Sequence, residues 1–359
     1  MPIGDKSFNR DEWCDLDLPL NGPSKAIRME KMRSLITAFP KQMSEAWSIA
    51  NGTAFEWANW SPKNVLILGM GGSGISGVIA SKMLSSSATV PIMANSDYDV
   101  PAWVGTETLI IACSYSGNTE ETLAALESAA GRGATVAAVT SGGTLGAWCD
   151  AKDWPSIRIP GGEPPRSQFG LAFTSVIRIL RSVELVPEQL YESLRNVSAT
   201  LAENQSLCIE RANAIADLVE GKSILLYADA SQEGLLARWR QQLNENSKLL
   251  CSHQVFPEMN HNELVGWESG SEEHVVIMIQ TPEDHPRTRI RMEICADIFQ
   301  NQGADVLVVE GDGDDEMTRF FDLIHVGDWL SLILAERSGV DPVDIRNIDH
   351  LKNSLAKID

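Results

Sequence analysis

The stretch from Ala112 to Thr122 reads A-C-S-Y-S-G-N-T-E-E-T and lies between an apolar run and a helical pattern. Where a strand passes into a helix, the first backbone N–H groups of the helix lack partners and carry the positive end of its dipole. Ser114, Ser116 and Thr119 add hydroxyl donors here, and Gly117 permits a turn that a Cβ would hinder. These features predict a site for an anion such as phosphate, held by dipoles and hydrogen bonds because the stretch contains no lysine or arginine.

A simpler interpretation of the same stretch is that Asn118 or Thr119 caps the helix that follows. A cap requires one such residue, whereas several polar residues crowd this turn. We therefore favour phosphate binding, in line with the tendency of α/β sheets to bind ligands at the carboxyl ends of their strands.

A second candidate loop, Leu68-Gly-Met-Gly-Gly-Ser-Gly74, also follows an apolar run and opens a helical pattern. Its glycines fit G-x-G-x-x-G, a dinucleotide-binding pattern that is weak evidence by itself. Such sites also have an acidic residue after the next strand, and Asp97 occupies that position here. The interpretation that we prefer is that Gly71 and Gly72 let the backbone approach a small ligand, to which Ser73 donates a hydrogen bond.

Glu245 is the candidate base for proton transfer. It lies in Gln241–Lys248, within a helical pattern predicted over Gln232–Leu250. The apolar stripe of this helix includes Leu236, Trp239, Leu243 and Leu250. Beside that stripe the carboxylate would be partly desolvated and would therefore be a better base. The alternative is a solvated glutamate that pairs with Lys248.

His261 lies between two asparagines in Phe256–Gly266 and is a second candidate for acid–base chemistry. A single histidine is more commonly a surface or capping residue. Metal binding by His261 with Glu258 and Glu263 is another interpretation, but no further histidine occurs at ligand spacing, so we expect no metal.

Two cations complete the candidate set. Arg166 ends Gly161-Gly-Glu-Pro-Pro-Arg166, where the prolines would stiffen the loop and hold the guanidinium near developing negative charge. Lys352 lies in Asn347–Leu355 near the C-terminus. The alternatives are an exposed loop arginine and a lysine on a solvated helix face.

Hydrophobic patterns predict the elements that would hold these residues. In the first half, apolar runs bounded by turn residues predict strands at Asn64–Leu68, Val90–Met93, Thr108–Ala112 and Thr135–Thr140. Helical patterns occur at Ser73–Leu84 and Glu120–Ala130. Apolar strands that alternate with helices predict a parallel sheet covered on both faces.

The second half repeats this alternation. Strands are predicted at Ser223–Tyr227, His274–Ile279 and Asp305–Val309, and helices at Gln232–Leu250 and Arg287–Gln300. Gly131–Val139 and Asn301–Val309 both read as helix end, glycine and strand, which indicates two related α/β subdomains. The hydroxyl loop occurs only in the first.

Domain boundaries follow from these patterns and from the proline- and glycine-rich stretch that begins at Pro160. Bridging helices are predicted at Leu171–Leu185 and Pro187–Val219, and final helices at Phe320–Arg337 and Val343–Lys357. We expect an N-terminal segment at 1–26, subdomain 1 at 27–160, a linker with bridging helices at 161–219, and subdomain 2 with the C-terminal helices at 220–359.

Composition limits the function classes. The 359 residues are enough for about two domains, and the formal net charge of -20 makes nucleic acid an unlikely partner. The 6 cysteines are scattered without a C-x-x-C pair, which indicates reduced thiols. The sequence has no signal-peptide pattern and no apolar run of membrane length, so we expect a cytoplasmic protein that does not engage a membrane.

The pair G-M-G-G-S-G-I-S-G and S-Y-S-G-N-T-E-E-T resembles a sugar isomerase (SIS) domain, and from about Ile27 onward the chain resembles the bifunctional phosphoglucose/phosphomannose isomerase family. The resemblance implies two SIS-type subdomains, each a doubly wound, mostly parallel sheet flanked by helices. It also implies a homodimer that needs no cofactor.

The resemblance further implies aldose–ketose isomerisation of glucose 6-phosphate, and of mannose 6-phosphate, to fructose 6-phosphate. In N-E-N-x-K the family's glutamate is the proton-transfer base, which corresponds to Glu245. In P-E-x-N-H-N-E the histidine opens the sugar ring from the partner subunit, which corresponds to His261. The closing I-D-x-L-K places Lys352 near the ring oxygen or O1, and Arg166 would stabilise the enediolate.

One position departs from the family. Asp341-Pro-Val343 stands where relatives read Asp-Pro-Thr-Pro, and that threonine is linked to room for the mannose epimer. Two other functions fit the same loops: a non-catalytic sugar-phosphate sensor, and another SIS enzyme such as an aminosugar-phosphate isomerase or deglycase. A sensor would not need Glu245 and His261, and this chain has both.

Overall fold

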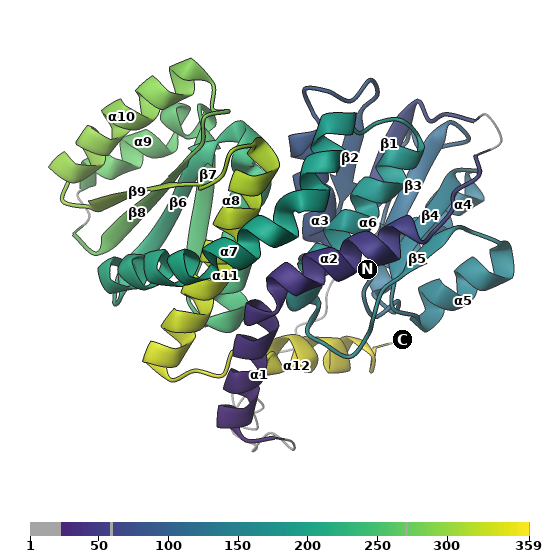
Figure 1. Cartoon of the computed structure of the whole chain (residues 1–359), viewed down its shortest axis with the longest axis horizontal. Helices are drawn as coiled ribbons and strands as arrows, with labels where there is room; N and C mark the ends of the chain where they lie inside the picture. The colour runs from purple at the N-terminus through teal and green to yellow at the C-terminus, as the bar shows by residue number, and fades with distance from the viewer. Residues whose placement is uncertain (1–22, 58–59, 270–271, 359) are drawn as a thin grey trace.

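The computed structural model describes residues 23–57, 60–269 and 272–358. Figure 1 shows two α/β units side by side, each with its own sheet. The sheet orders are β2-β1-β3-β4-β5 and β7-β6-β8-β9, and every paired strand is parallel. The predicted α/β class with two parallel-sheet subdomains is therefore confirmed.

The first sheet places the two polar loops next to each other. Its strands are β1 (Asn64–Leu68), β2 (Ile92–Asn95), β3 (Thr108–Cys113), β4 (Thr135–Thr140) and β5 (Ser156–Arg158). Its helices are α3 (Gly71–Met83), α4 (Glu120–Gly131), α5 (Gly143–Lys152) and α6 (Phe169–Ser182). The chain leaves β1 for β2 on one side and returns to β3 on the other, so the strand order reverses between β1 and β3. A crevice forms outside the carboxyl ends of two such strands, and ligands of α/β proteins bind there.

The second sheet repeats this topology. Its strands are β6 (Ser223–Asp229), β7 (Cys251–Phe256), β8 (His274–Gln280) and β9 (Asp305–Glu310), and its helices are α8 (Glu233–Asn246), α9 (Glu263–Gly266) and α10 (Pro286–Asn301). Gly133 and Gly303, at the matching turns into β4 and β9, both have positive φ, at 82° and 94°. The two units therefore share strand order and turn geometry, as expected of a duplication.

Long helices join the units. They are α1 (Lys25–Thr37), α2 (Phe39–Asn51), α7 (Glu188–Val219), α11 (Glu316–Ser338) and α12 (Arg346–Leu355). α11 is buried on all sides from Phe320 to Ala335 and packs against α7 and α8, while α3 and α8 pack together at the boundary between the sheets. Among the described residues, no helix combines the length and apolar character that crossing a bilayer requires.

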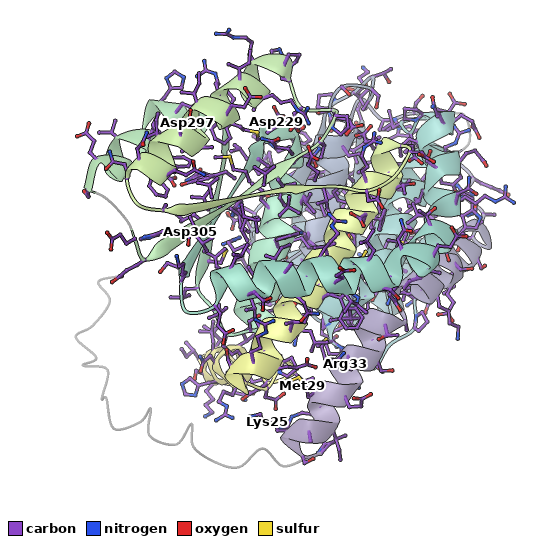
Figure 2. All side chains as sticks on the ribbon, turned by 60° about the vertical axis from the view of Figure 1, so that its left-hand side comes forward. Lys25, Met29, Arg33, Asp229, Asp297 and Asp305 are labelled. Carbon is purple, nitrogen blue, oxygen red and sulfur yellow. The ribbon has the colours of Figure 1, made fainter. Side chains whose placement is uncertain are left out.

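α1 is held against the end of α11 by charged side chains. Figure 2 shows Lys25, Met29 and Arg33 following one another along α1. Arg33 pairs with Glu336, with Nη2 2.5 Å from Oε1, and the Lys25 ammonium donates to the carbonyl of Gly339. Both partners belong to the C-terminal end of α11, so α1 covers the region where the chain turns toward α12.

The predicted helix over Gln232–Leu250 is wrong at its C-terminal end. α8 ends at Asn246, Lys248 adopts φ 58°, and Leu250 is 94% exposed instead of lying on the apolar stripe. The next residues form β7, which pairs with β6 at the edge of the sheet. An edge strand is partly solvated and can contain polar residues. β7 therefore lacks the continuous apolar run by which the inner strands were predicted.

Other differences also fall on edges and covering helices. β2 runs over Ile92–Asn95 instead of Val90–Met93, and β5 has only 3 residues. Both are edge strands. Among the described α-helices, no range was predicted for α1, α2, α5 or the short α9.

A buried histidine on α11 should make stability depend on pH. Burial lowers the pKa of His325 to about 4, and Trp329 Nε1 donates to its Nε2 at 3.1 Å, which requires an unprotonated acceptor. The unfolded chain binds this proton near pH 6.5. The stabilising contribution is thus complete above about pH 6.5 and is lost as the pH falls toward 4.

Protonation of His325 should lower the unfolding free energy of the wild type by about 2 kcal/mol between pH 7 and pH 5. We expect this part of the pH dependence to be absent in His325→Gln. Chemical denaturation of wild type and variant at both pH values measures this difference. An unchanged pH dependence in the variant would show that another group is responsible.

Candidate active site

The two polar loops form one cradle at the carboxyl ends of β1 and β3. The backbone N–H of Tyr115 donates to Ser73 Oγ at 3.0 Å, which joins the start of α3 to the loop before α4. Ser114 Oγ lies 2.9 Å from Thr119 Oγ1. No side chain caps α3 or α4, so two helix N-termini present their first N–H groups side by side. This arrangement suits a phosphate-sized anion.

The capping interpretation of the hydroxyl loop is wrong. Thr119 occupies the N-cap position of α4, but its side chain makes no capping hydrogen bond. Asn118 Oδ1 instead accepts from the backbone N–H of Thr144 at 2.9 Å, which ties the loop to the start of α5. Ser114 is buried and Ser116 is exposed, so their hydroxyls occupy different depths of the cradle.

Gly117 and Gly72 are required by close backbone approaches. At Gly117, φ is 70°, and a Cβ would lie 1.9 Å from the carbonyl oxygen of Gly142. At Gly72, a Cβ would lie 2.9 Å from the backbone nitrogen of Arg166. The glycine loop therefore serves to bring Arg166 against the start of α3, while Gly71, with φ 49°, faces open space.

The dinucleotide interpretation of the glycine loop gains no support from the topology. The strand order around β1 is 2-1-3-4-5, not the 3-2-1-4-5 order of dinucleotide-binding sheets. Asp97 is exposed, and its Oδ1 accepts from the neighbouring backbone N–H of Tyr98 at 2.6 Å, as in a local turn.

Arg166 is the most constrained cation of the site. It lies in a short 3₁₀ helix (Pro165–Gln168) and is 3% exposed, so the exposed-loop alternative is wrong. Its Nε donates to Asn246 Oδ1 at 2.7 Å, its Nη1 to Glu245 Oε2 at 3.0 Å, and its Nη2 to the carbonyl of Pro342. Burial lowers the pKa of Arg166, and the charge of Glu245 opposes this effect.

Glu245 lies in the last turn of α8 and is brought to the first subdomain through Arg166. Its carboxylate pairs with Arg166. The alternative of a solvated glutamate that pairs with Lys248 is therefore wrong. The Lys248 ammonium donates instead to two backbone carbonyls, those of Glu245 and Asp344. Burial, together with the nearby charge of Arg166, lowers the pKa of Lys248 to about 8.

A cavity of about 460 Å³ adjoins Glu245. It is lined by Asn244, Glu245, Lys248, Asp344, Ile345, Arg346, Asn347 and Ile348. The lining thus combines the end of α8 with the start of α12. Lys352 lies one turn farther along α12 with its side chain exposed, and none of the described contacts ties it to Arg166 or Glu245.

His261 lies apart from this cluster within one chain. It ends a short 3₁₀ helix (Glu258–His261) after β7 and is exposed. The neighbouring Asn260 contacts Cys295 and Arg291 on α10. The structure therefore brings Arg166 and Glu245 together beside the cradle, but none of the described contacts joins His261 to them.

The metal interpretation of the His261 segment is weakened by its carboxylates. Glu258 accepts from Asn262 Nδ2 at 2.9 Å, and Glu263 accepts from the hydroxyl of Tyr227. In the part of the chain that the structure describes, no three His, Cys, Asp or Glu side chains converge to hold a metal ion.

Sequence reasoning missed three groups that hold the cations of the site. Two of them hold Arg166, namely the side chain of Asn246 and the carbonyl of Pro342, and the third, the carbonyl of Asp344, holds the neighbouring Lys248. The sequence did offer a hint of the role of Asn246, because an amide next to the candidate base is unusual on a helix surface. Backbone carbonyls carry no sequence signal.

Two family models and several named relatives match this chain. Residues 60–153 match the SIS domain, and residues 209–355 match the bacterial phospho-glucose isomerase C-terminal SIS domain. The chain is 34% identical over 331 residues to the bifunctional phosphoglucose/phosphomannose isomerase of Caldicellulosiruptor bescii, covering 89% of this chain and 97% of that one. It is 32% identical over 325 residues to the protein of the same name from Aquifex aeolicus, covering 88% and 99%.

A solved structure shows the same fold at low identity. The C-terminal domain of glucosamine-fructose-6-phosphate aminotransferase from Francisella tularensis superposes with a TM-score of 0.69 at 15% identity, covering 86% of this chain and 96% of that one.

The close approach at Gly117 generates a stability prediction. Gly117→Ala would combine a strained φ with a clash against the carbonyl of Gly142, so we expect the unfolding free energy to fall by at least about 2 kcal/mol. Gly131→Ala, at the end of α4, meets nothing within 4 Å and should be neutral or slightly stabilising. Urea denaturation compares the two variants. Equal stability of both would contradict the tight turn.

Proposed function

This chain belongs to the bifunctional phosphoglucose/phosphomannose isomerase family and is a phosphosugar isomerase with SIS domains, and from that premise we propose that it interconverts glucose 6-phosphate and mannose 6-phosphate with fructose 6-phosphate. One observation carries the proposal: the ion pair between Arg166 and Glu245, with 3.0 Å between Nη1 and Oε2, stands beside the anion cradle, although Arg166 belongs to the linker at 161–219 and Glu245 to subdomain 2.

The phosphate anchors the substrate in this proposal. Ser114, Ser116 and Thr119, with the open N-termini of α3 and α4, hold the phosphate through neutral donors. The anchor lies away from the reacting carbons, so its binding energy serves to orient C1 and C2. Gly71, Gly72 and Ser73 line the approach of the sugar.

Proton transfer falls to Glu245. Its carboxylate removes the proton from C2, and the electrons of that bond form the enediol as O1 takes up a proton. Return of the proton to C1 and loss of the O2 proton complete the ketose. C1 is reduced and C2 is oxidised by the same two electrons, so the reaction is an intramolecular oxidoreduction that needs no external electron acceptor. Arg166 stabilises the negative charge on the oxygens of the intermediate.

Ring opening falls to His261 of a second copy, with Lys352 near the ring oxygen or O1. Two observations support a homodimer in which this histidine crosses the interface. His261 is exposed, and none of the described contacts joins it to Glu245 of its own chain. Val265, Ile290 and Ile294, on the α9 and α10 surfaces near it, are exposed apolar side chains of the kind that an interface covers.

Two alternatives use the same cradle, and neither explains the ion pair as well. A sugar-phosphate sensor has no use for a carboxylate beside an arginine at the reacting carbons. An aminosugar-phosphate isomerase or deglycase would share Glu245 and Arg166 but would act on amino sugars. A coupled assay that measures fructose 6-phosphate formed from glucose, mannose and glucosamine 6-phosphates separates the three.

The base assignment predicts a large and selective loss. We expect Glu245→Gln to lower kcat by about 10²- to 10⁴-fold while fructose 6-phosphate still binds. Glu233→Gln is the matched control, because Glu233 is in the first turn of the same helix and pairs with Lys82. It should leave kcat within about twofold of wild type. Steady-state kinetics and calorimetric binding measure both. Full turnover by the Glu245 variant would remove it from the base role.

The shared site predicts complementation between two inactive variants. If His261 acts in the partner's site, a 1:1 mixture of His261→Asn and Glu245→Gln chains forms heterodimers in which one of two sites is intact. After co-refolding, turnover should reach about a quarter of the wild-type rate. A mixture as inactive as its components would place both residues in the site of one chain, or show that the chain works as a monomer.

A further inference from the structure

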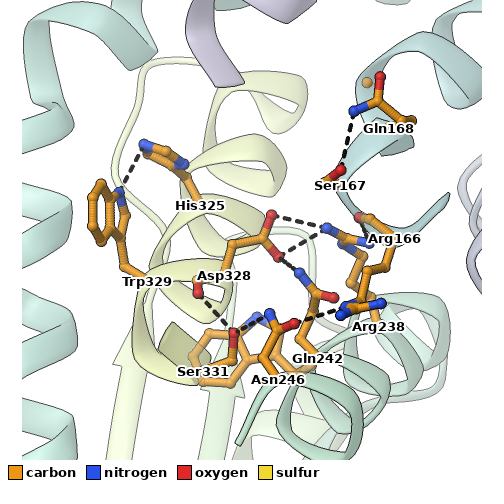
Figure 3. A network of polar contacts seen from close by, with 12 residues as sticks. Arg166, Ser167, Gln168, Arg238, Gln242, Asn246, His325, Asp328, Trp329 and Ser331 are labelled. Atoms are coloured by element: carbon orange, nitrogen blue, oxygen red, sulfur yellow. Dashed lines mark hydrogen bonds and ion pairs between the residues drawn. The ribbon is translucent and has the colours of Figure 1, made fainter. Parts of the chain in front are cut away.

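A network of buried polar groups contacts Arg166 (Figure 3). Asp328 on α11 forms a bidentate ion pair with Arg238 on α8, at 2.9 and 2.8 Å. Arg238 Nη1 donates to the backbone carbonyl of Arg166 at 3.1 Å. Both partners of the ion pair are buried, and Gln242 Nε2 donates to Asp328 Oδ1 at 2.7 Å.

The same chain of contacts returns to Asp328 and closes a ring. Arg166 Nε donates to Asn246 Oδ1, and Asn246 Nδ2 donates to Ser331 Oγ at 3.0 Å. Ser331 Oγ donates to the backbone carbonyl of Asp328 at 2.7 Å. We call Arg166, Arg238, Asn246, Asp328 and Ser331 the arginine ring.

We propose that Arg238, Asp328 and Ser331 are positioning residues for the isomerisation, because the arginine ring fixes the backbone and the guanidinium of Arg166 independently. Arg238 holds the backbone carbonyl, and Asn246, itself held by Ser331, holds Nε. Nη1 is then aimed at Glu245. This inference rests on the proposed function, since it assigns the ring an effect on the chemical step.

A purely stabilising role explains the ring less well. Desolvation of a buried ion pair offsets most of its Coulomb attraction, and well-packed apolar residues commonly do as well. The Cζ atom of Arg238 already lies 4.7 Å from the centre of the Phe169 ring, so the surroundings would accept an apolar side chain. What an apolar replacement cannot supply is a donor to the Arg166 carbonyl.

The structure provides a matched control on α11. Asp322 is also buried and pairs with Arg211 on α7 at 2.7 Å, but none of the described contacts connects that pair to Arg166. Asp328→Asn and Asp322→Asn therefore remove the same charge from the same helix. A general loss of stability affects both variants, whereas a loss of positioning affects one.

We expect both variants to melt at lower temperature and only Asp328→Asn to lose kcat, by at least about tenfold, with the KM for fructose 6-phosphate within about threefold of wild type. Asp322→Asn should keep kcat within about twofold. Equal losses of kcat in the two variants, or an unchanged kcat in Asp328→Asn, would overturn the inference.

A milder pair of variants covers the case in which Asp328→Asn does not fold. Ser331→Ala removes one hydroxyl of the ring. Ser175→Ala removes an equally buried helix hydroxyl that donates to the carbonyl of Leu171 at 2.7 Å, outside the ring. A lower kcat in Ser331→Ala alone supports positioning. Equal kcat values in both overturn it.

A readout that needs no substrate separates this inference from the proposed function. The buried Nε–H of Arg166 should give a slowly exchanging signal in a ¹H–¹⁵N spectrum, assigned by its absence from Arg166→Lys. We expect rapid exchange in Ser331→Ala and retained protection in Ser175→Ala. Protection retained in both would show that the ring does not hold Nε. The wild type could show no isomerase activity while Nε–H exchange still becomes rapid in Ser331→Ala alone. That result would overturn the isomerase proposal but would support the geometry of the arginine ring.

Discussion

Burial of the Arg166 guanidinium is the constraint on which the rest of the structure depends. A cation that is 3% exposed must find its counter-charge and its acceptors inside the protein, because an unpaired buried charge is strongly destabilising. The acceptors are Glu245 and Asn246 from the end of α8 and the carbonyl of Pro342 from the turn after α11. They meet only when the two subdomains are docked, so the contacts that complete the fold also assemble the candidate site.

Duplication explains why the two subdomains contribute different parts. Both sheets have the same strand order, but α3 and α4 of the first have no side-chain cap, whereas in the second the side chain of His285 caps α10. In the second, Asp229 accepts from the backbone N–H of Ser231, and Asp284 accepts from that of Thr281, both at 2.9 Å. Burial raises the pKa of Asp284, and the nearby Asp229 adds to this effect. Internal carboxylates thus occupy the place of a ligand anion, and the second subdomain supplies the end of α8 instead.

The parts of this arrangement that the sequence predicted are those with strong local signals. Inner strands such as β1 and β4 were placed to the residue, because they are apolar on both faces. The cradle residues Ser73 and Ser114 were found because polar residues at a strand end stand out. β7 was missed because this edge strand lacks the continuous apolar run of the inner strands, and no strand was predicted between the helix ending at Leu250 and the strand starting at His274. The acceptors of Arg166 could not be predicted, since two sequence-distant segments meet there only through tertiary packing.

The distribution of charge indicates how such a site can recognise a dianion on an acidic chain. The formal net charge is -20, and repulsion between exposed charges extends over about 8 Å at physiological ionic strength. Helix dipoles and hydroxyl donors act only within about the first turn, so they operate after the phosphate has reached the cradle. Arg166, a buried cation beside the cradle, already has Glu245 as its counter-ion. Recognition therefore rests on the geometry of neutral donors more than on net attraction. In the proposed reaction the arginine and glutamate form a nearly neutral pair, whose charge would be redistributed as a proton moved between substrate and base.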